Sequence, residues 1–240
     1  RCHNVVGILR GSDPKLANEY VVFTAHLDHL GKGAAVDGDT IYNGALDNAS
    51  GVAIMLESAR LLATSKIRPK RSIIFLAVTA EERGLLGSRH FAMFPTVPKE
   101  AIVANVNVDM PMALFPMDGF TVFGAEHSTL GAVAERALAA EKVAMMPDPD
   151  PAEVFFVRSD QYSFVREGIP ALYVDSAAKS SDPAVDPDAV FGEFLLRDYH
   201  MPSDEVDLPI DWPTLATLAR VNARIGLAVA NDRRRPRWLD

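Results

Sequence analysis

The chain has 240 residues, of which 48% are hydrophobic and 23% charged, and its net charge is −8. This length and composition favour one globular domain with a full core. The negative charge argues against a nucleic-acid-binding protein, which normally carries a basic patch. A basic run at 233–237 is typical of a solvated tail, and no apolar stretch approaches the ~20 residues that a membrane helix needs.

In chain order, apolar runs that predict strands alternate with patterns that predict helices. The strands are expected at 5–9, 20–25, 71–78, 101–108, 120–123 and 171–174. The helices are expected at 52–63, 85–94, 130–142 and 161–166, with a last one that begins near Pro213 and is capped by Asp211. Asn48 and Ser50 are candidate caps of the first helix.

This alternation predicts βαβ units, and therefore a parallel core sheet with helices on both of its faces. The segments 145–151 and 176–188 are expected to be loops, and neither is long enough to separate domains. We therefore expect residues 1–240 to form a single domain.

Acidic residues and histidines follow three of the predicted strands. In open α/β sheets ligands bind beyond the carboxyl ends of the strands, so these side chains should converge. Together with an Asp before the first long helix and a His in a late loop, the set comprises His26, Asp28, His29, Asp47, Glu81, Glu82, Asp109 and His200. Because Cys2 is the only cysteine, a metal here would be held by imidazole and carboxylate groups, which suit zinc.

Each of these residues also has an ordinary explanation when it is taken alone. A histidine near a strand end is often a satisfied polar group, and an acidic pair such as Glu81 and Glu82 can compensate a helix dipole. Asp28 and Asp47 are common turn formers. The repetition at three strand ends is what favours a metal site.

Five segments of the chain resemble, in the same order, the co-catalytic zinc aminopeptidases of the clan that also contains glutamate carboxypeptidase and glutaminyl cyclase. The segments are AHLDHLG, YNGALDNASGVA, AVTAEERGLLGS, NVNVDM and DYHMPSDE. The resemblance runs from about residue 4 to the C-terminus. It implies a three-layer α/β/α fold of the zinc-dependent exopeptidase type, with a mostly parallel mixed central sheet and two Zn²⁺ ions per chain.

The resemblance also implies a ligand set. His26 and Asp109 would bind one zinc ion, Glu82 and His200 would bind the other, and Asp47 would bridge the two, with a cis peptide between Asp47 and Asn48. Asp28 would orient His26, because metal-binding imidazoles usually donate their other N–H to a carboxylate. His29 is expected to support the ligands or to line the pocket wall.

The implied reaction is hydrolysis of the N-terminal peptide bond of peptides that have a free N-terminus. A metal-bound hydroxide would be the nucleophile, and Glu81 would be the general base and acid; spacing alone does not say which of Glu81 and Glu82 faces the metal. The residues expected to contact substrate are Arg158, Asp160, Met110 and Tyr199, although Arg158 also suits a structural salt bridge. Gln161 stands where the family often has His, and its role is left open.

Three alternatives remain at this point. A single-zinc glutaminyl cyclase and a carboxypeptidase belong to the same clan, although a carboxypeptidase would want several arginines and Arg158 is the obvious candidate. A non-catalytic binding module is disfavoured, because the five ligands and the base are all present.

The resemblance further implies a longer precursor with an upstream protease-associated domain, and a periplasmic or secreted location. The preferred N-terminal residue and the native metal are not readable from the sequence. The oligomeric state is also open, and the sequence is compatible with a monomer.

Overall fold

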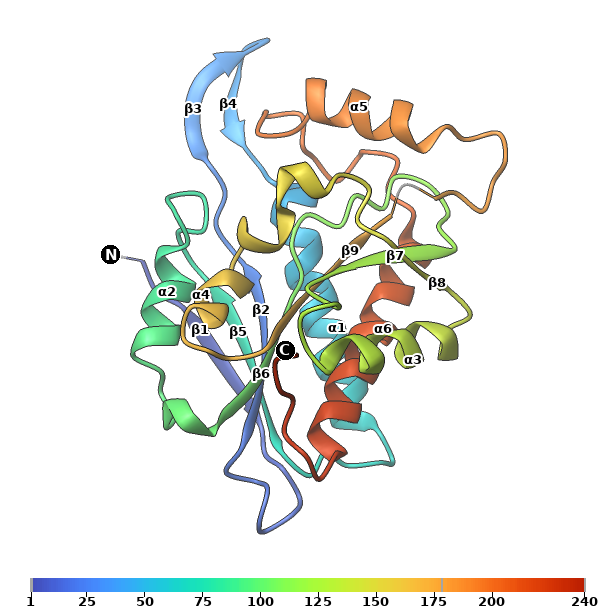
Figure 1. Cartoon of the computed structure of the whole chain (residues 1–240). Helices are drawn as coiled ribbons and strands as arrows, with labels where there is room; N and C mark the ends of the chain where they lie inside the picture. The colour runs from blue at the N-terminus through green and yellow to red at the C-terminus, as the bar shows by residue number, and fades with distance from the viewer. Residues whose placement is uncertain (1, 178, 240) are drawn as a thin grey trace.

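The computed structural model describes residues 2–177 and 179–239, and within them a seven-stranded mixed sheet lies between two layers of helices (Figure 1). The strand order is β1-β5-β2-β6-β9-β7-β8. The strands are β1 (Val5–Leu9), β2 (Tyr20–His26), β5 (Ser72–Val78), β6 (Ile102–Asn107), β7 (Gly119–Phe123), β8 (Ala144–Met146) and β9 (Ala171–Ser176). The expected three-layer fold is confirmed.

The centre of the sheet is parallel. Strand β2 pairs in parallel with β5 on one side and with β6 on the other, and β6 pairs in parallel with β9. Strands β1 and β7 run antiparallel to their neighbours β5 and β9, which makes the sheet mixed. The carboxyl ends of β2, β5 and β6 therefore lie at one edge, where the candidate ligands follow them.

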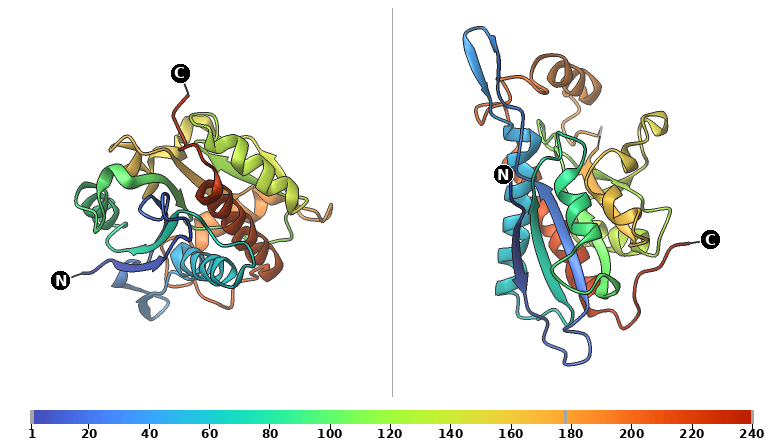
Figure 2. Two further views of the ribbon diagram at one scale, coloured as in Figure 1. Left: turned by 90° about the horizontal axis from the view of Figure 1, so that it is seen from below. Right: turned by 90° about the vertical axis from the view of Figure 1, so that its left-hand side faces the viewer.

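Helices cover both faces of the sheet (Figure 2). One layer holds α1 (Gly51–Thr64), α3 (Leu130–Ala140) and α6 (Trp212–Asn231), and the other holds α2 (Leu86–Met93) and α4 (Gln161–Val165). Successive side chains of a strand point to opposite faces. Accordingly Val21 and Phe23 enter the larger core beside α1 and α6, whereas Tyr20 and Val22 enter the smaller core on the other face.

All strands and helices expected from the sequence are present, but four elements were not anticipated. These are β8, a hairpin of β3 (Gly31–Val36) and β4 (Asp39–Tyr42), and the helix α5 (Pro187–Arg197). The loop prediction for 176–188 is wrong at both ends, because Ser176 ends β9 and Pro187 begins α5; residue 178 lies outside the described residues. The loop prediction for 145–151 is wrong at its start, where β8 ends. Strand β3 is exposed along its length and therefore lacks the alternation of a half-buried strand. Helix α5 packs one apolar face, Val190, Phe191 and Phe194, against the core.

Of the helices in the described part of the chain, none combines the length and the apolar character needed to cross a lipid bilayer.

A buried arginine ties the start of β5 to the end of α6. The side chain of Arg71 is fully buried, and its Nε lies 2.6 Å from Glu19 Oε2. Its Nη1 donates hydrogen bonds to the carbonyl oxygens of Val229 and Asp232. Burial alone would raise the pKa of Glu19, but Arg71 and Arg235 outweigh burial and hold this pKa below its ordinary value of 4.5.

Substitution Glu19→Gln should therefore lower the free energy of unfolding at pH 7 by about 3 kcal/mol, because it leaves a buried guanidinium without its counter-charge. A carboxylate with a lowered pKa stabilises the fold above its unfolded pKa and loses this effect as the pH falls through its folded pKa. The difference between wild type and variant in urea unfolding should thus be full at pH 7 and vanish well below pH 4.5. Glu57→Gln, at an exposed pair with Arg60, should leave stability unchanged; a pH-independent difference for Glu19→Gln would contradict the interpretation.

Candidate metal centre

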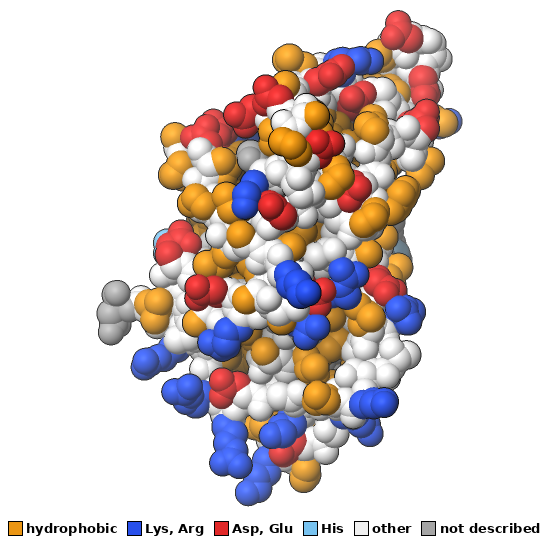
Figure 3. Space-filling view, turned by 90° about the vertical axis from the view of Figure 1, so that its right-hand side faces the viewer, with side chains coloured by type: hydrophobic (Ala, Val, Ile, Leu, Met, Phe, Trp, Pro, Cys, Tyr) orange, Lys and Arg blue, Asp and Glu red, His pale blue; other side chains and the backbone are white. Residues whose placement is uncertain are grey.

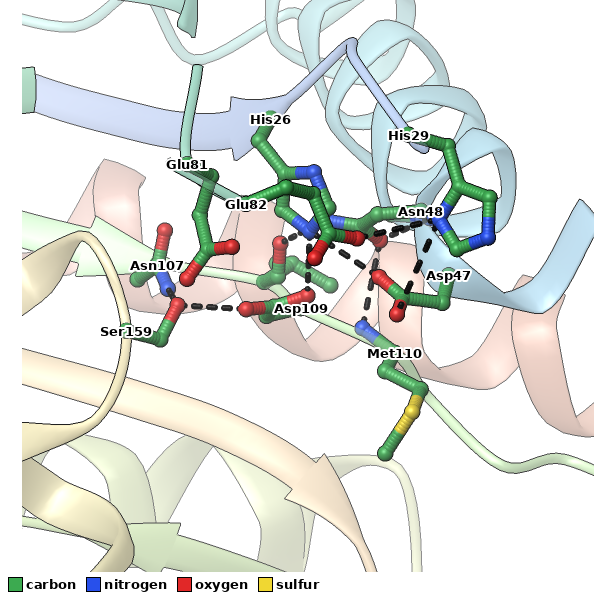
Figure 4. Close-up of polar contacts among 12 residues, drawn as sticks. His26, His29, Asp47, Asn48, Glu81, Glu82, Asn107, Asp109, Met110 and Ser159 are labelled. Atoms are coloured by element: carbon green, nitrogen blue, oxygen red, sulfur yellow. Dashed lines mark hydrogen bonds and ion pairs between the residues drawn. The ribbon is translucent and has the colours of Figure 1, made fainter. Parts of the chain in front are cut away.

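The segments that follow β2, β5 and β6 bring imidazole and carboxylate groups together at one edge of the sheet (Figure 4). His26 is the last residue of β2, and its Nε2 lies 2.8 Å from Asp109 Oδ1, just beyond β6. The same nitrogen lies 3.1 Å from Asp47 Oδ1. These three side chains offer ligand atoms that all lie within 4.8 Å of one another.

A second group of ligand atoms lies on the other side of Asp47. The Nε2 of His200 lies 3.1 Å from Asp47 Oδ2 and 3.3 Å from Glu82 Oε2. Asp47 therefore presents one carboxylate oxygen to His26 and the other to His200. A shared carboxylate of this kind is what joins two metal ions in co-catalytic sites.

The position of Asp47 is fixed by its backbone and by two neighbouring side chains. It lies in an irregular turn over Ala45–Ser50, in which Asp47 and Asn48 have non-helical backbones, and the Asp47–Asn48 peptide is cis, as the resemblance implied. The carboxylate of Asp204 accepts hydrogen bonds from the backbone N–H groups of Leu46 (2.8 Å) and Asp47 (3.0 Å). Asn48 caps α1 at Gly51, donates to the Val108 carbonyl and accepts from the Met110 N–H, which ties this turn to the end of β6.

The orientation of His26 differs in one respect from the expectation. Its Nδ1 donates a hydrogen bond of 3.0 Å to the backbone carbonyl of Asp28, whereas the Asp28 carboxylate lies 3.9 Å away. The carboxylate instead accepts a hydrogen bond of 3.2 Å from the Glu81 N–H. Asp28 therefore fixes the His26 ring through its main chain, and its side chain positions Glu81. Because a carbonyl only accepts, Nδ1 carries the proton and Nε2 faces Asp47 and Asp109.

Asp109 is held from behind by a chain of buried polar groups. The Ser159 hydroxyl donates to Asp109 Oδ2 at 2.5 Å, and the Tyr173 hydroxyl donates to the Asp109 carbonyl at 3.1 Å. Asn107 donates to both Ser159 Oγ and Gln161 Oε1, each at 2.9 Å. Gln161 is thus a buried support of the Asp109 side of the site, which answers the question left open by the sequence.

Three non-glycine residues at the edge of the site have a left-handed backbone: Ala80 (φ 58°), Met110 (φ 35°) and His200 (φ 59°). Such conformations are unfavourable for residues with a Cβ and tend to gather at functional sites. Ala80 precedes Glu81, Met110 follows Asp109, and His200 is itself a candidate ligand. The strained backbone therefore lies where side chains must point toward a common site.

The protein's own groups shift the pKa values of the site strongly. Burial would lower the pKa of His26, but the carboxylates of Asp109 and Asp47 outweigh it and hold this pKa far above its ordinary value. Burial would raise the pKa of Asp47, but His200 and His26 outweigh it and lower that pKa well below its usual range. Burial, followed by the charge of Asp109, raises the pKa of Glu81 to about 9.

The donor atoms fit divalent metal ions of the zinc type. Imidazole nitrogens and carboxylate oxygens form three groups that could each hold an ion: His26 with Asp47 and Asp109, His29 with Asp47 and Glu82, and His26 with Glu81 and Glu82. The concentration of buried acid and base in so small a volume would be costly without a further charged partner.

Metal uptake should release protons, because the raised pKa of His26 means that Nε2 carries a proton at neutral pH, which a metal ion must displace. A raised pKa favours the protonated form over a wider range of pH, so the apparent affinity for Zn²⁺ should increase as the pH rises from 6 to 8. Calorimetric titration of the chelator-treated protein in buffers of different ionisation enthalpy would measure the release. An identical observed enthalpy in all buffers would contradict it.

A cavity of about 120 Å³ opens onto these groups. Its lining comprises Asp47, Glu81, Glu82, Asp109, Met110, Phe155, Arg158, Ser159, Tyr173, Tyr199 and His200. Three of the four residues expected to contact substrate, Met110, Arg158 and Tyr199, are among them. The fourth, Asp160, is fully buried and does not line the cavity, so its placement does not fit a direct contact with substrate.

Arg158 at the cavity also makes the salt bridge that the sequence left open as an alternative. Its Nη1 lies 2.6 Å from Glu153 Oε2, and its guanidinium lies 5.4 Å from the centre of the Phe155 ring. Both partners are on the same short segment, so Arg158 can keep this position while its side chain borders the cavity.

Comparison with known proteins agrees with the fold. The model of peptidase family M28 matches residues 4–226. Mouse "Aminopeptidase NAALADL1" is 38% identical over 113 residues, which are 45% of this chain and 13% of that protein. A solved structure of BSAP, a zinc aminopeptidase from Bacillus subtilis, superposes with a TM-score of 0.67 at 22% identity and covers 92% of this chain and 48% of that one.

Glutaminyl cyclase from Porphyromonas gingivalis has the same fold, with a TM-score of 0.65 at 20% identity over 92% of this chain and 76% of that one. The family match over residues 4–226, together with this fold, gives the class of the chain. The chain belongs to peptidase family M28, which confirms the resemblance noted in the sequence. It spans only about an eighth of the length of the mouse relative.

Proposed function

We propose that the chain is a two-zinc aminopeptidase, which hydrolyses the peptide bond after the N-terminal residue of a peptide. The observation that carries the proposal is the shared carboxylate of Asp47, with one oxygen beside His26 and the other beside His200. His26, Asp47 and Asp109 would hold one ion, and Asp47, Glu82 and His200 would hold the other. When bound, such ions polarise a carbonyl group and lower the pKa of water.

Glu81 is the proposed general base and acid. It follows β5, lines the cavity and is held through its backbone N–H by Asp28. The surrounding carboxylates and its burial favour the protonated form, and positive charge beside it would favour the ionised form that can accept a proton. A carboxylate in this place can take a proton from the attacking water and pass it to the leaving amine.

The acidic end of the molecule suits a substrate that has a free ammonium group. Within the cavity itself, two Zn²⁺ ions would offset the charge of the four lining carboxylates, Asp47, Glu81, Glu82 and Asp109. On the surface, Figure 3 shows acidic side chains gathered toward the end of the molecule that carries α5, and Lys and Arg toward the opposite end. A surface field of this sign attracts the amino end of a peptide.

The small volume of the cavity supports removal of one residue at a time. Met110, Phe155 and Tyr199 supply apolar surface against which the side chain of the first residue can pack. Substrates that are blocked at the amino group should therefore be poor, even when their side chains are apolar.

The proposal is tested by assaying the purified protein on leucyl and methionyl p-nitroanilides, with the N-acetylated compounds as matched controls. Activity on the free amines alone, lost with a chelator and restored by Zn²⁺, is the expected result. The fold shared with glutaminyl cyclase makes that activity the second candidate. Cyclisation of glutaminyl peptides without hydrolysis, by protein that takes up one zinc ion, would favour the cyclase.

A further inference from the structure

His29 is the histidine beside the metal centre that the proposed two-ion ligand set does not use, although it forms a possible ion-binding group with Asp47 and Glu82. It lies in the segment after β2, and its side chain is only 5% exposed. Its Nδ1 lies 3.0 Å from Glu82 Oε1 and 3.9 Å from Asp47 Oδ2, so the ring is aimed at these two carboxylates (Figure 4). His200 contacts the same two carboxylates. Neither ring nitrogen has a hydrogen-bond partner among the described residues.

The contact between His29 and Glu82 is short, but it is not a hydrogen bond. Glu82 Oε1 also has no hydrogen-bond partner within residues 2–177 and 179–239, although the His29 nitrogen is 3.0 Å away. Two ligand atoms that bind the same metal ion lie close together although they form no hydrogen bond with each other. A buried imidazole with no hydrogen bond would otherwise be costly.

The distances fit His29, Asp47 and Glu82 around one ion, with His200 beside the same two carboxylates. With zinc–ligand bonds of 2.0–2.1 Å in a tetrahedral site, neighbouring ligand atoms are about 3.3 Å apart. His29 Nδ1 lies 3.0 Å from Glu82 Oε1 and 3.9 Å from Asp47 Oδ2, and His200 Nε2 lies 3.3 Å from Glu82 Oε2 and 3.1 Å from Asp47 Oδ2. The His29 and His200 rings meet edge to face with centres 5.5 Å apart, so both can approach the same point without overlap.

The ring of His29 is also held in place by the backbone behind it. Gly44 has a left-handed backbone (φ 70°), and a Cβ on this residue would lie 2.6 Å from His29 Cγ. The glycine thus lets the turn that carries Asp47 pack directly against the His29 ring, and it leaves the ring little freedom to turn away from Glu82.

We propose that Nδ1 of His29 is a further protein ligand of the ion at the Glu82–His200 position, an inference that rests on the proposed two-ion function. This position would then have four protein ligands, His29, Asp47, Glu82 and His200. The position of His26 and Asp109 would have three with the shared Asp47. Zinc sites with four protein ligands are closed, whereas catalytic sites keep a free position. The ion beside His29 should therefore be the more tightly held of the two.

The test is a zinc titration of the chelator-treated full chain, read by calorimetry and by metal analysis, for wild type and for His29→Ala, His29→Asn and His90→Asn. His90 is an exposed residue of α2 and serves as the matched control. Wild type and the control should bind two ions with unequal affinities. Both His29 variants should bind one of the ions at least about 100-fold more weakly, which exceeds the usual effect of losing a residue that only supports a ligand.

The asparagine variant separates a ligand from a hydrogen-bond donor, because its amide N–H can still reach Glu82 but cannot replace the imidazole. X-ray absorption of the fully loaded proteins gives an independent count, which should fall from three imidazoles per two zinc ions to two. Circular dichroism and thermal unfolding check that each variant is folded.

Wild-type affinity in His29→Ala, or its recovery in His29→Asn, would overturn the proposal while the two-ion function stands. Uptake of fewer than two ions by the wild type would instead refute the proposed function, and the imidazole count of the bound ion would still decide the place of His29.

Discussion

Substitution Glu81→Gln should reduce kcat by about 10³-fold or more, while the protein keeps its full zinc content. The amide has the same shape as the carboxylate but cannot accept the proton of the attacking water, whereas the hydrogen bond from the backbone N–H of residue 81 to Asp28 does not involve the side chain and stays. Loss of a general base typically costs about 10²–10⁴-fold in rate. Turnover of an aminoacyl anilide and metal analysis on the same sample would measure both quantities.

The adjacent carboxylate provides the matched control. Glu82 lies 3.3 Å from His200 and faces the second group of ligands, so Glu82→Gln should lower zinc content as well as activity. The rising limb of the pH profile of kcat/KM should disappear in Glu81→Gln, because it reports ionisation of the base. Turnover near that of the wild type, or equal loss of zinc in both variants, would contradict the roles given to the two residues.

The buried parts of the fold could be predicted from the sequence because burial leaves a pattern. Strand β2 is buried along its length, and its apolar residues alternate between two cores, which requires helices on both faces. The hairpin β3–β4 is exposed, and its signal was local: Asp37 and Gly38 have left-handed backbones and form the two-residue turn between its strands. The signals of α5 were also local, with Asp186 as its N-cap and Pro187 at its start, and they were missed.

The candidate site was predictable to the extent that strand ends and motifs locate side chains. His26, Glu82 and Asp109 follow neighbouring parallel strands, so the topology alone brings them together. Asp47 and His200 lie in irregular segments, where their position before a helix and in a late loop only suggested them, and the resemblance implied their ligand roles. The presence of an upstream domain and the extracytoplasmic location stay predictions.

The finer details required three-dimensional geometry. The Asp28 main chain, and not its carboxylate, holds His26, and no spacing rule separates the two. Asp204 accepts hydrogen bonds from the turn that carries Asp47, although the two lie far apart in the sequence. The available signal was that Asp204 lies in the same DYHMPSDE segment as His200. Asp160 follows Ser159 at the cavity and immediately precedes α4, but its side chain is fully buried.

Substitution Asp47→Asn should remove both zinc ions at once, so that metal content falls below one ion per chain and activity falls to background. Its two oxygens face His26 and His200 separately, and a neutral amide offers a single oxygen and no charge to offset two divalent cations.

Asp109→Asn is the decisive comparison, because Asp109 contacts His26 and lies on the first group alone. This variant should lose one ion and keep the other, as measured by metal analysis after dialysis against a weak chelator. Both variants remove one negative charge and almost no volume, so net charge cannot explain a difference between them. If the two lose zinc equally, Asp47 does not bridge, and the two positions are coupled by the field of the cluster instead of by a shared ligand.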